Sequence, residues 1–283
     1  MTQNRNYYEI RVFGLKRAGN HAIINWIAEM ASKVFNEPVY FLNSCGTHKA
    51  DPFRTHAVRG DKKGTEIDDM FIKLPNMSRW KKDEIDSIRF KQKKCLLYSY
   101  EDFDIKYLLE NDFVKNREYT IGLSNYIFNI IIIRDLFNWM ASVIKAQTDS
   151  GTIPPKTDYL LRRWKIYAQY YLDKITFPPG KTIYILFNNW FSYEEYRKNI
   201  AKKLSLTYSD QALKYVGAPR GRGSSFDGMK HEKYADQMDV LNRWKFFRNN
   251  PILFEHLDND AISMSNTIFG RIFDIDLTLK GIA

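Results

Sequence analysis

The chain has 283 residues, 44% of them hydrophobic and 15% aromatic, which is enough to bury a full core and excludes a disordered or low-complexity scaffold. Its 43 Lys and Arg against 33 Asp and Glu give a net charge of +10, which favours an anionic partner but leaves nucleic acid, an anionic membrane surface and a phosphorylated small molecule open. Two cysteines, Cys45 and Cys95, can neither form a disulfide framework nor complete a four-ligand zinc site by themselves, which predicts a reducing compartment.

The composition and the first residues predict the compartment. The longest apolar stretch, residues 127–133, contains Asn129 and is followed by Arg134, so it is far too short to span a bilayer. The first seven residues are polar and lack the apolar core of a signal peptide. We therefore expect a protein of the reducing cytoplasm, without a transmembrane segment.

The first predicted unit is a strand, a loop and a helix. Residues 9–13 alternate apolar and polar side chains, as a strand does, and a turn bracketed by Gly14 and Gly19 follows them. Beyond the turn, Ile23, Ile27 and Met30 recur at helical spacing. The pattern predicts a strand that enters a helix through a glycine-bracketed loop.

Residues 126–133 give the strongest strand signal, because they end in four consecutive isoleucines. A strand that is apolar on both faces is typical of the centre of a parallel sheet. Further strands are predicted over 38–42, 95–98 and 182–187, and further helices over 136–146, 158–175, 193–204 and 234–247. Ser192, followed three residues later by Glu195, indicates a capping box at the start of the helix 193–204.

Strands that alternate with helices predict an α/β fold, specifically a three-layer α/β/α sandwich around a central, mostly parallel sheet. No linker rich in Gly, Ser or Pro divides the sequence, so we expect one domain over residues 1–283. Residues 43–94 carry many charges and weak periodicity, and we interpret them as loops and short helices. They and residues 248–283 are expected to be substrate-side or peripheral elaborations.

The loop after the first strand is a candidate phosphate site. Its residues are Gly14, Leu15, Lys16, Arg17, Ala18, Gly19, Asn20 and His21. Backbone N–H groups converge in such a loop, and the following helix N-terminus adds a partial positive charge. The loop lacks the Gly-Lys-Ser/Thr ending that supplies a magnesium-binding hydroxyl in nucleotide-triphosphate P-loops. The alternatives are a phosphate handled without metal and a simple tight turn.

A second candidate is Arg134, at the carboxyl end of the isoleucine strand, together with Ser142 eight residues later. Ligands of parallel α/β sheets gather beyond the carboxyl ends of strands, where an arginine can donate two hydrogen bonds to a phosphate. Alternatively, Arg134 pairs with a neighbouring carboxylate, and Ser142 is a small residue that lets two helices pack closely.

A third candidate lies in the glycine-, arginine- and serine-rich segment 217–228. Its candidate ligand-binding residues are Arg220, Arg222, Gly223, Ser224 and Ser225. Glycines allow a close backbone approach, while the arginines and serines supply charge and hydrogen-bond donors for a phosphate. The alternative is a flexible basic surface loop.

The order of these three segments resembles that of sulfotransferases, which move a sulfuryl group from 3′-phosphoadenosine 5′-phosphosulfate (PAPS). The loop from Gly14 is similar to the family's 5′-phosphosulfate loop, and Arg134 with Ser142 is similar to its 3′-phosphate motif. Residues 221–225 stand where the family has its Arg-Lys-Gly-type loop. The resemblance covers residues 8–230 and implies a P-loop-like sulfotransferase architecture, PAPS as the donor and no metal.

The resemblance also implies roles for single residues. Arg17 stands at the position of the family's usual catalytic lysine, beside Lys16, and both would stabilise charge on the leaving 5′-phosphate. A general base must lie within hydrogen-bond reach of the acceptor hydroxyl. Glu101 is the first choice, with His48 and His21 as weaker candidates. Asp102 is expected to point the other way, as neighbours along a strand do.

Two other classes of function remain open on the sequence. A P-loop kinase would share the first loop and the sheet and would use ATP with Mg²⁺. A non-catalytic basic module would bind nucleic acid or a polyanionic glycan with salt-sensitive affinity. The acceptor, a small molecule or a glycan in the sulfotransferase reading, is not identified by any motif.

Overall fold

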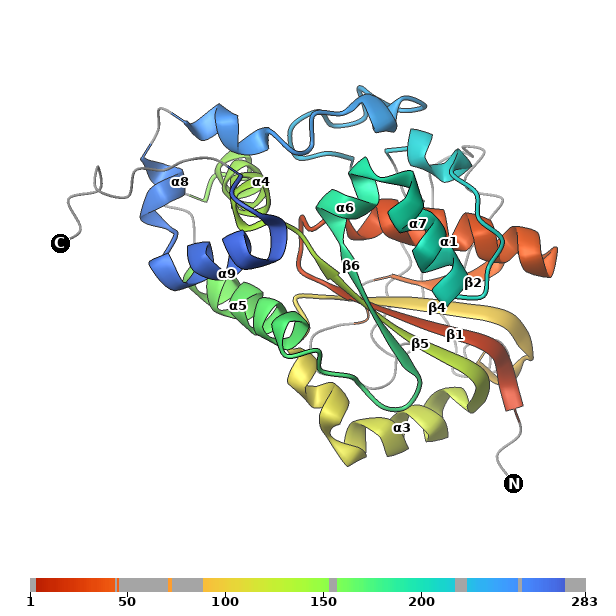
Figure 1. Cartoon of the computed structure of the whole chain (residues 1–283). Helices are drawn as coiled ribbons and strands as arrows, with labels where there is room; N and C mark the ends of the chain where they lie inside the picture. Colours follow the sequence, from red (N-terminus) through yellow and green to blue (C-terminus); the bar gives the residue numbers. More distant parts are fainter. Residues whose placement is uncertain are drawn as a thin grey trace.

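A computed structural model of the chain describes residues 4–43, 45, 71–72, 89–152, 157–216, 223–248 and 251–272. Within these ranges, six strands form one sheet in the order β3-β2-β4-β1-β5-β6 (Figure 1). Every neighbouring pair is parallel. The strands are β1 (Asn4–Gly14), β2 (Val39–Leu42), β3 (Phe71–Ile72), β4 (Lys93–Glu101), β5 (Leu123–Ile133) and β6 (Lys181–Leu186).

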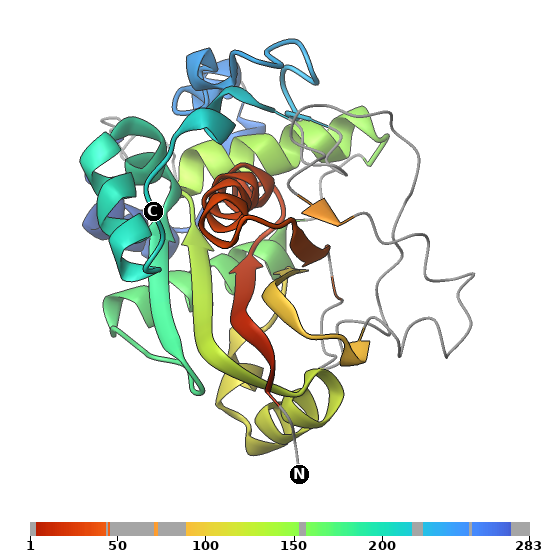
Figure 2. The ribbon, with the colours of Figure 1, turned by 90° about the vertical axis from the view of Figure 1, so that its right-hand side faces the viewer.

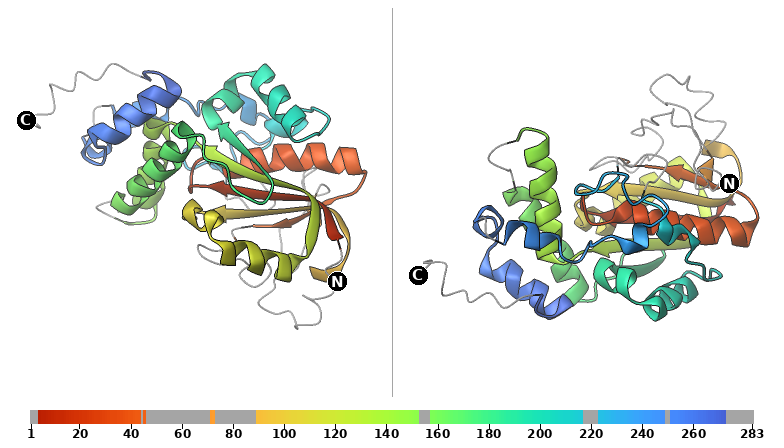
Figure 3. Two further views of the ribbon diagram at one scale, coloured as in Figure 1. Left: turned by 60° about the horizontal axis from the view of Figure 1, so that its bottom comes forward. Right: turned by 90° about the horizontal axis from the view of Figure 1, so that it is seen from above.

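Helices cover both faces of this sheet. The α-helices are α1 (Asn20–Phe35), α3 (Asn111–Ile121), α4 (Leu136–Asp149), α5 (Asp158–Leu172), α6 (Phe187–Ser192), α7 (Glu194–Lys203), α8 (Ile252–Glu255) and α9 (Asn259–Phe269). The 3₁₀ helices are η3 (Ile105–Leu109), η4 (Gln211–Lys214), η5 (Ala235–Gln237) and η6 (Arg243–Phe247). Helices α1, α6 and α7 lie on one face and α3 and α5 on the other (Figures 1 and 3). The predicted three-layer α/β/α sandwich is confirmed.

The isoleucine strand has the central place that its sequence predicts. β5 lies between β1 and β6, and Ile130–Ile133 are each at most 2% exposed. Side chains on both of its faces are therefore buried, as expected where helices cover a parallel sheet on both sides. The carboxyl ends of β1 and β5 point toward the side of the molecule where the segment after residue 223 lies (Figure 2).

The predicted helix over 234–247 is wrong. Only the 3₁₀ helices η5 and η6 form there, because tertiary hydrogen bonds take the carbonyl groups that a helix would use. The Arg134 guanidinium donates to the carbonyl oxygen of Val240, and Asn138 Nδ2 donates to that of Leu241 at 2.8 Å. The Asn138 side-chain oxygen in turn accepts from the N–H of Trp244 at 3.2 Å. These hydrogen bonds to Arg134 and Asn138 take the place of the backbone bonds that residues 234–247 would form within an α-helix.

Two further local predictions need correction. Ser192 ends the short helix α6 instead of capping α7, which begins at Glu194 without a side-chain cap. Phe187 and Trp190 of α6 are buried in the core. Their burial fixes this short helix, and Ser192 is its last residue. Residues 43–94 were expected to hold only loops and short helices, but Phe71–Ile72 pairs with β2 as β3 and β4 begins at Lys93. Two residues are too few to show strand alternation in the sequence.

A buried ion pair fastens α3 to the sheet. The carboxylate of Glu9 in β1 is fully buried and accepts from the Arg117 guanidinium, which is 1% exposed. Tyr98 Oη and Ser124 Oγ each donate to the same carboxylate at 2.6 Å. Arg11 Nε lies 3.9 Å from it. The pair thus joins α3, β1, β4 and β5 on the face opposite α1.

Lys93 makes the stability of the fold depend on pH. Burial, followed by the charges of Arg5 and Lys91, lowers the pKa of Lys93 to about 7. Between pH 7 and the ordinary lysine range, the unfolded chain binds a proton that the folded chain has released, so the free energy of unfolding rises with pH. We expect this rise to reach about 1 kcal/mol per pH unit between pH 7 and 9 and to be lost in Lys93→Met. Urea denaturation of both proteins at several pH values measures it, and parallel curves would contradict it.

Candidate functional site

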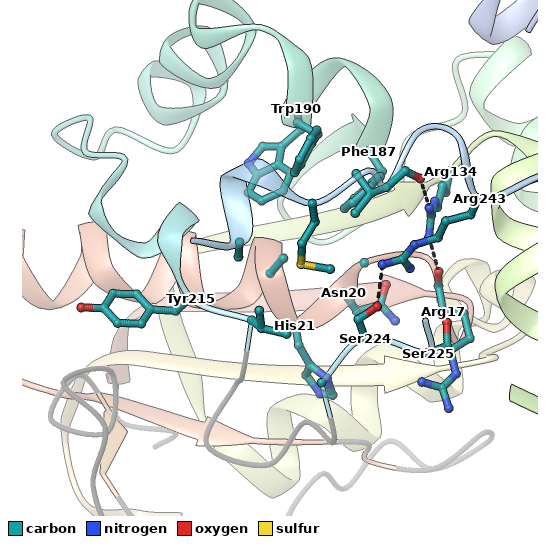
Figure 4. A pocket seen from close by; sticks show the side chains of 18 of the residues that line it. Arg17, Asn20, His21, Arg134, Phe187, Trp190, Tyr215, Ser224, Ser225 and Arg243 are labelled. Atoms are coloured by element: carbon teal, nitrogen blue, oxygen red, sulfur yellow. Dashed lines mark hydrogen bonds between the residues drawn. The ribbon is translucent and has the colours of Figure 1, made fainter. Parts of the chain in front are cut away.

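A cavity of about 760 Å³ opens at the carboxyl end of β1. Its size lies in the range of small-molecule sites, about 300–1,000 Å³. The side chains that surround it come from segments far apart in the sequence (Figure 4). They include Lys16, Arg17, Asn20, His21, Glu101, Arg134, Phe187, Trp190, Phe191, Tyr215, Val216, Ser224, Ser225, Met238 and Arg243.

The glycine-bracketed loop forms one wall of the cavity. The Ala18 N–H donates to the carbonyl oxygen of Leu15 at 3.1 Å, which closes the turn. Gly19 has φ +91° and is the N-cap of α1. Asn20 Nδ2 donates back to Leu15 at 3.1 Å, while its Oδ1 is buried and has no hydrogen-bond partner among the described residues. The first turn of α1 therefore meets the cavity with its positive end, which suits an anion.

Position 19 requires a glycine because of its backbone conformation and because the Phe187 ring lies against it. A Cβ atom there would lie 2.2 Å from the Phe187 ring, and φ +91° is strained for alanine. We expect Gly19→Ala to lower the free energy of unfolding by about 3 kcal/mol. Gly151→Ala is the matched control, because Gly151 has φ +84° but nothing within 4 Å of an added Cβ, so it loses only about 1 kcal/mol. Equal losses in denaturation would contradict the contact with Phe187.

Lys16 is held by its backbone and by its side chain. Its N–H donates to Asp102 Oδ1 at 2.9 Å, and its Nζ lies 3.4 Å from Asp102 Oδ2. Its carbonyl oxygen accepts from Trp139 Nε1 at 2.9 Å. Asp102 thus holds the loop from a position just past the end of β4, where its backbone has a φ of +54°. Glu101 lines the cavity, whereas Asp102, which was expected to point the other way, does not.

Arg134 is a buried cation at this site. It is 2% exposed, and its Nη1 donates to the carbonyl oxygen of Arg17 at 3.1 Å and to Ser142 Oγ at 3.3 Å. Among the described residues no carboxylate forms an ion pair with it, since Asp135 instead accepts from Asn138 and Asn188. Burial, followed by the charge of Arg243, lowers the pKa of Arg134. An anion in the cavity would relieve this unfavourable charge.

Ser142 supports Arg134 from behind. Its side chain is fully buried, its Oγ donates to the carbonyl oxygen of Asn138 at 2.8 Å, and it is not among the residues that line the cavity. The structure therefore brings Ser142 to Arg134 and does not place it in the cavity wall.

Arg243 is a cavity residue that the sequence did not reveal. Its Nη2 donates to Ser224 Oγ at 2.6 Å and lies 3.3 Å from Asp227 Oδ2. Burial lowers the pKa of Arg243, and the charge of Arg17 contributes in the same direction. Arg17, Arg134 and Arg243 lie together at one end of the cavity (Figure 4). No motif indicated Arg243, which falls within the predicted helix 234–247 that does not form.

The late loop reaches the cavity through three of its predicted residues. Gly223, Ser224 and Ser225 line it. Ser224 Oγ accepts from the N–H groups of Phe226 and Asp227, both at 3.1 Å, which fixes the turn. Ser225 Oγ is buried without a hydrogen-bond partner among the described residues. The predictions for Arg220 and Arg222 lie outside the described residues.

The other end of the cavity is apolar and aromatic. Trp190, Tyr215, Val216 and Met238 line it, and Tyr215 lies on the side away from the arginines (Figure 4). The Phe187 ring lies between the two ends, with the Arg134 guanidinium 5.0 Å from its centroid. The cavity therefore offers a flat apolar surface next to a cationic one.

His21 and Glu101 are the candidate proton acceptors that the cavity holds. His21 Nε2 lies 3.1 Å from Asn43 Oδ1, which also accepts from Ser99 Oγ at 3.1 Å. Glu101 ends β4 beside the loop, opposite Gly14 in the register of the sheet. The weaker candidate His48 lies outside the described residues.

The structure gathers most of the predicted site residues around one cavity. Those that line it are Lys16, Arg17, Gly19, Asn20, His21, Glu101, Arg134, Gly223, Ser224 and Ser225. Gly14, Leu15 and Ala18 form the turn without lining the cavity.

Comparisons with known proteins give a likeness to solved structures. No protein-family model and no curated protein matches the chain. The chain is similar to a sulfotransferase domain from the curacin biosynthetic pathway, with a TM-score of 0.46 and 12% identity over 92% of this chain and 96% of that one. It is also similar to mouse sulfotransferase SULT7A1 complexed with PAP, with a TM-score of 0.36 and 13% identity over 93% and 82%. None of the described helices is both long and apolar enough to cross a membrane. Both of these solved structures are sulfotransferases, and the likeness to them is one of fold.

Proposed function

We propose that this protein transfers a sulfuryl group from PAPS to a hydroxyl or amine group of an acceptor, without a metal ion. The observation that carries the proposal is the pair of buried guanidinium groups, Arg134 and Arg243, in the wall of the same cavity as a strand–loop–helix anion site. One cavity thus offers two places for phosphate. PAPS carries phosphate at two positions of one nucleoside, which distinguishes it from ATP.

The cavity walls suggest how the donor lies. The arginine group would bind the 3′-phosphate by charge-assisted hydrogen bonds, and the loop from Gly14 to Gly19 would bind the 5′-phosphosulfate at the N-terminus of α1. The aromatic end with Trp190 and Tyr215 would hold the adenosine. Desolvation of Arg134 is a cost that the 3′-phosphate offsets.

The residues present can also support the transfer step. A loose in-line displacement forms the bond from the acceptor oxygen to sulfur while the bond from sulfur to the 5′-phosphate breaks. Lys16 and Arg17 would neutralise the charge that develops on the leaving phosphate, an effect worth about 3–4 kcal/mol of barrier. Glu101 would accept the acceptor's proton. The products are the sulfated acceptor and adenosine 3′,5′-bisphosphate (PAP).

Titration calorimetry with PAP, ATP with Mg²⁺, and heparin tests this function. We expect PAP to bind and to raise the thermal unfolding midpoint, with ATP–Mg²⁺ and heparin much weaker. Preference for ATP–Mg²⁺ would indicate a kinase instead. Binding of heparin alone, falling steeply with salt, would indicate a basic module. A screen of hydroxyl and amine acceptors with sulfur-labelled PAPS then identifies the acceptor class.

A further inference from the structure

Asp102 fastens the end of β4 to the loop after β1 by three contacts. Its own N–H donates to the carbonyl oxygen of Gly14 at 3.1 Å. Its Oδ1 accepts from the Lys16 N–H at 2.9 Å, and its Oδ2 lies 3.4 Å from Lys16 Nζ. A single side chain therefore holds both the backbone and the ammonium group of Lys16.

The backbone of Asp102 is unusual in a way that serves these contacts. Its φ of +54° lies in the left-handed region, which a non-glycine residue adopts at some cost. Asp102 does not line the cavity that Glu101 lines. Its carboxylate is 7% exposed beneath the loop, while the Lys16 side chain is 61% exposed. The lysine is thus anchored at a fixed and mostly buried counter-ion.

Arg17, the neighbouring cation, is arranged differently. Its carbonyl oxygen accepts from Arg134, and its charge contributes to the lowered pKa of Arg243. Arg17 therefore belongs electrostatically to the arginine group. Lys16 is held apart from that group, at the end of β4 beside Glu101.

We infer that Asp102 is a positioning residue that holds Lys16 in place for the sulfuryl-transfer step and that competes with the donor's phosphate for the Lys16 ammonium. The inference rests on the proposed function. It assigns to Lys16 the charge stabilisation at the leaving 5′-phosphate and to Arg17 a part in binding the donor. Because the carboxylate and the phosphate share one ammonium, removing the carboxylate's charge frees Lys16 for the phosphate.

Asp102→Asn and Asp102→Ala separate the two parts of this role. Asparagine tolerates the left-handed backbone better than most residues, and its side-chain oxygen can still accept from the Lys16 N–H. Asp102→Asn therefore removes the ion pair and keeps the loop fastened. Asp102→Ala removes both, so we expect a lower thermal unfolding midpoint and weaker PAP binding than in Asp102→Asn.

Titration of PAP into wild type, Asp102→Asn, Lys16→Ala and the double variant measures the competition. We expect Asp102→Asn to bind PAP roughly fivefold more tightly than wild type. Asp104→Asn removes the same charge two residues away, at a carboxylate that pairs with Lys106 and does not line the cavity, so it reports the general effect of charge, about twofold. In the Lys16→Ala background, the effect of Asp102→Asn should fall to that general level.

The outcomes distinguish this inference from the proposed function. Equal effects of Asp102→Asn and Asp104→Asn, or an Asp102→Asn effect that persists in Lys16→Ala, would overturn the role of Asp102 while leaving PAP binding intact. A wild-type protein that does not bind PAP would instead contradict the proposed function. In that case pyrophosphate, which matches the loop's chemistry without a nucleoside, takes the place of PAP in the same four titrations. A fivefold gain in pyrophosphate affinity in Asp102→Asn that is lost in the Lys16→Ala background would then support the pairing of Asp102 with Lys16. Its absence would overturn that pairing.

Discussion

Arg134→Ala is expected to weaken binding of PAP by about 100-fold, while binding of adenosine 5′-monophosphate falls by less than about fivefold. Loss of a charge-assisted, desolvated contact costs about 2–4 kcal/mol, and 1.4 kcal/mol corresponds to a factor of ten. Only PAP carries the 3′-phosphate that the arginine group would bind, so only PAP should lose that contact. Calorimetric titration of both nucleotides into both proteins measures the difference.

Two variants control this experiment. Arg134→Lys keeps the charge but loses the planar fork, and we expect it to recover part of the PAP affinity. Ser142→Ala removes one partner of Arg134 without touching the cavity, and its effect on PAP should stay below about tenfold. Equal losses for the two nucleotides in Arg134→Ala, with an unchanged unfolding midpoint, would show that the 3′-phosphate is not bound there.

Arg117→Met is expected to have the largest effect on stability, a loss of about 3–5 kcal/mol in the free energy of unfolding. The reason is that the substitution leaves the fully buried Glu9 carboxylate without its close guanidinium partner. Arg11 remains at 3.9 Å but donates its Nη2 to the carbonyl oxygen of Pro179. Urea denaturation at neutral pH gives the value.

The double variant Glu9→Gln/Arg117→Met is the matched control. It removes both charges, so it should lose less stability than Arg117→Met alone, with the difference appearing as coupling in a double-mutant cycle. Additive losses would mean that Glu9 and Arg117 do not interact strongly. Folded Arg117→Met protein should bind PAP as wild type does, because α3 lies on the face of the sheet opposite α1 (Figure 3).

The sequence predicts those parts of the fold that depend on local patterns. The isoleucines of β5 and the spacing of apolar residues in α1 indicate buried elements, and each lies where a parallel α/β sandwich requires it. Both signals come from side chains within one element, so they need no knowledge of the partner. The loop between β1 and α1 is predictable for the same reason, since Gly19 marks the turn.

The rest of the site depends on contacts between distant residues. Arg243 joins the cavity because Ser224, 19 positions earlier, accepts its hydrogen bond, and no local pattern records that pairing. The helix expected around it is replaced by bonds from Arg134 and Asn138, which lie more than a hundred positions away. Asp102 contacts the loop through Lys16, 86 positions earlier, and no local pattern records that pairing either. Tertiary structure decides each of these features.

The separation of the cavity walls along the chain has a consequence for biosynthesis. Arg17 and Arg243 lie more than two hundred positions apart and yet line one hollow. At a translation rate of about 5–20 residues per second, the ribosome adds Arg243 roughly 11–45 s after Arg17. Until then, the nascent chain can pair its early strands, but the end of the cavity that Arg17, Arg134 and Arg243 line is incomplete. The complete cavity is therefore available only to a polypeptide whose final third has emerged and docked.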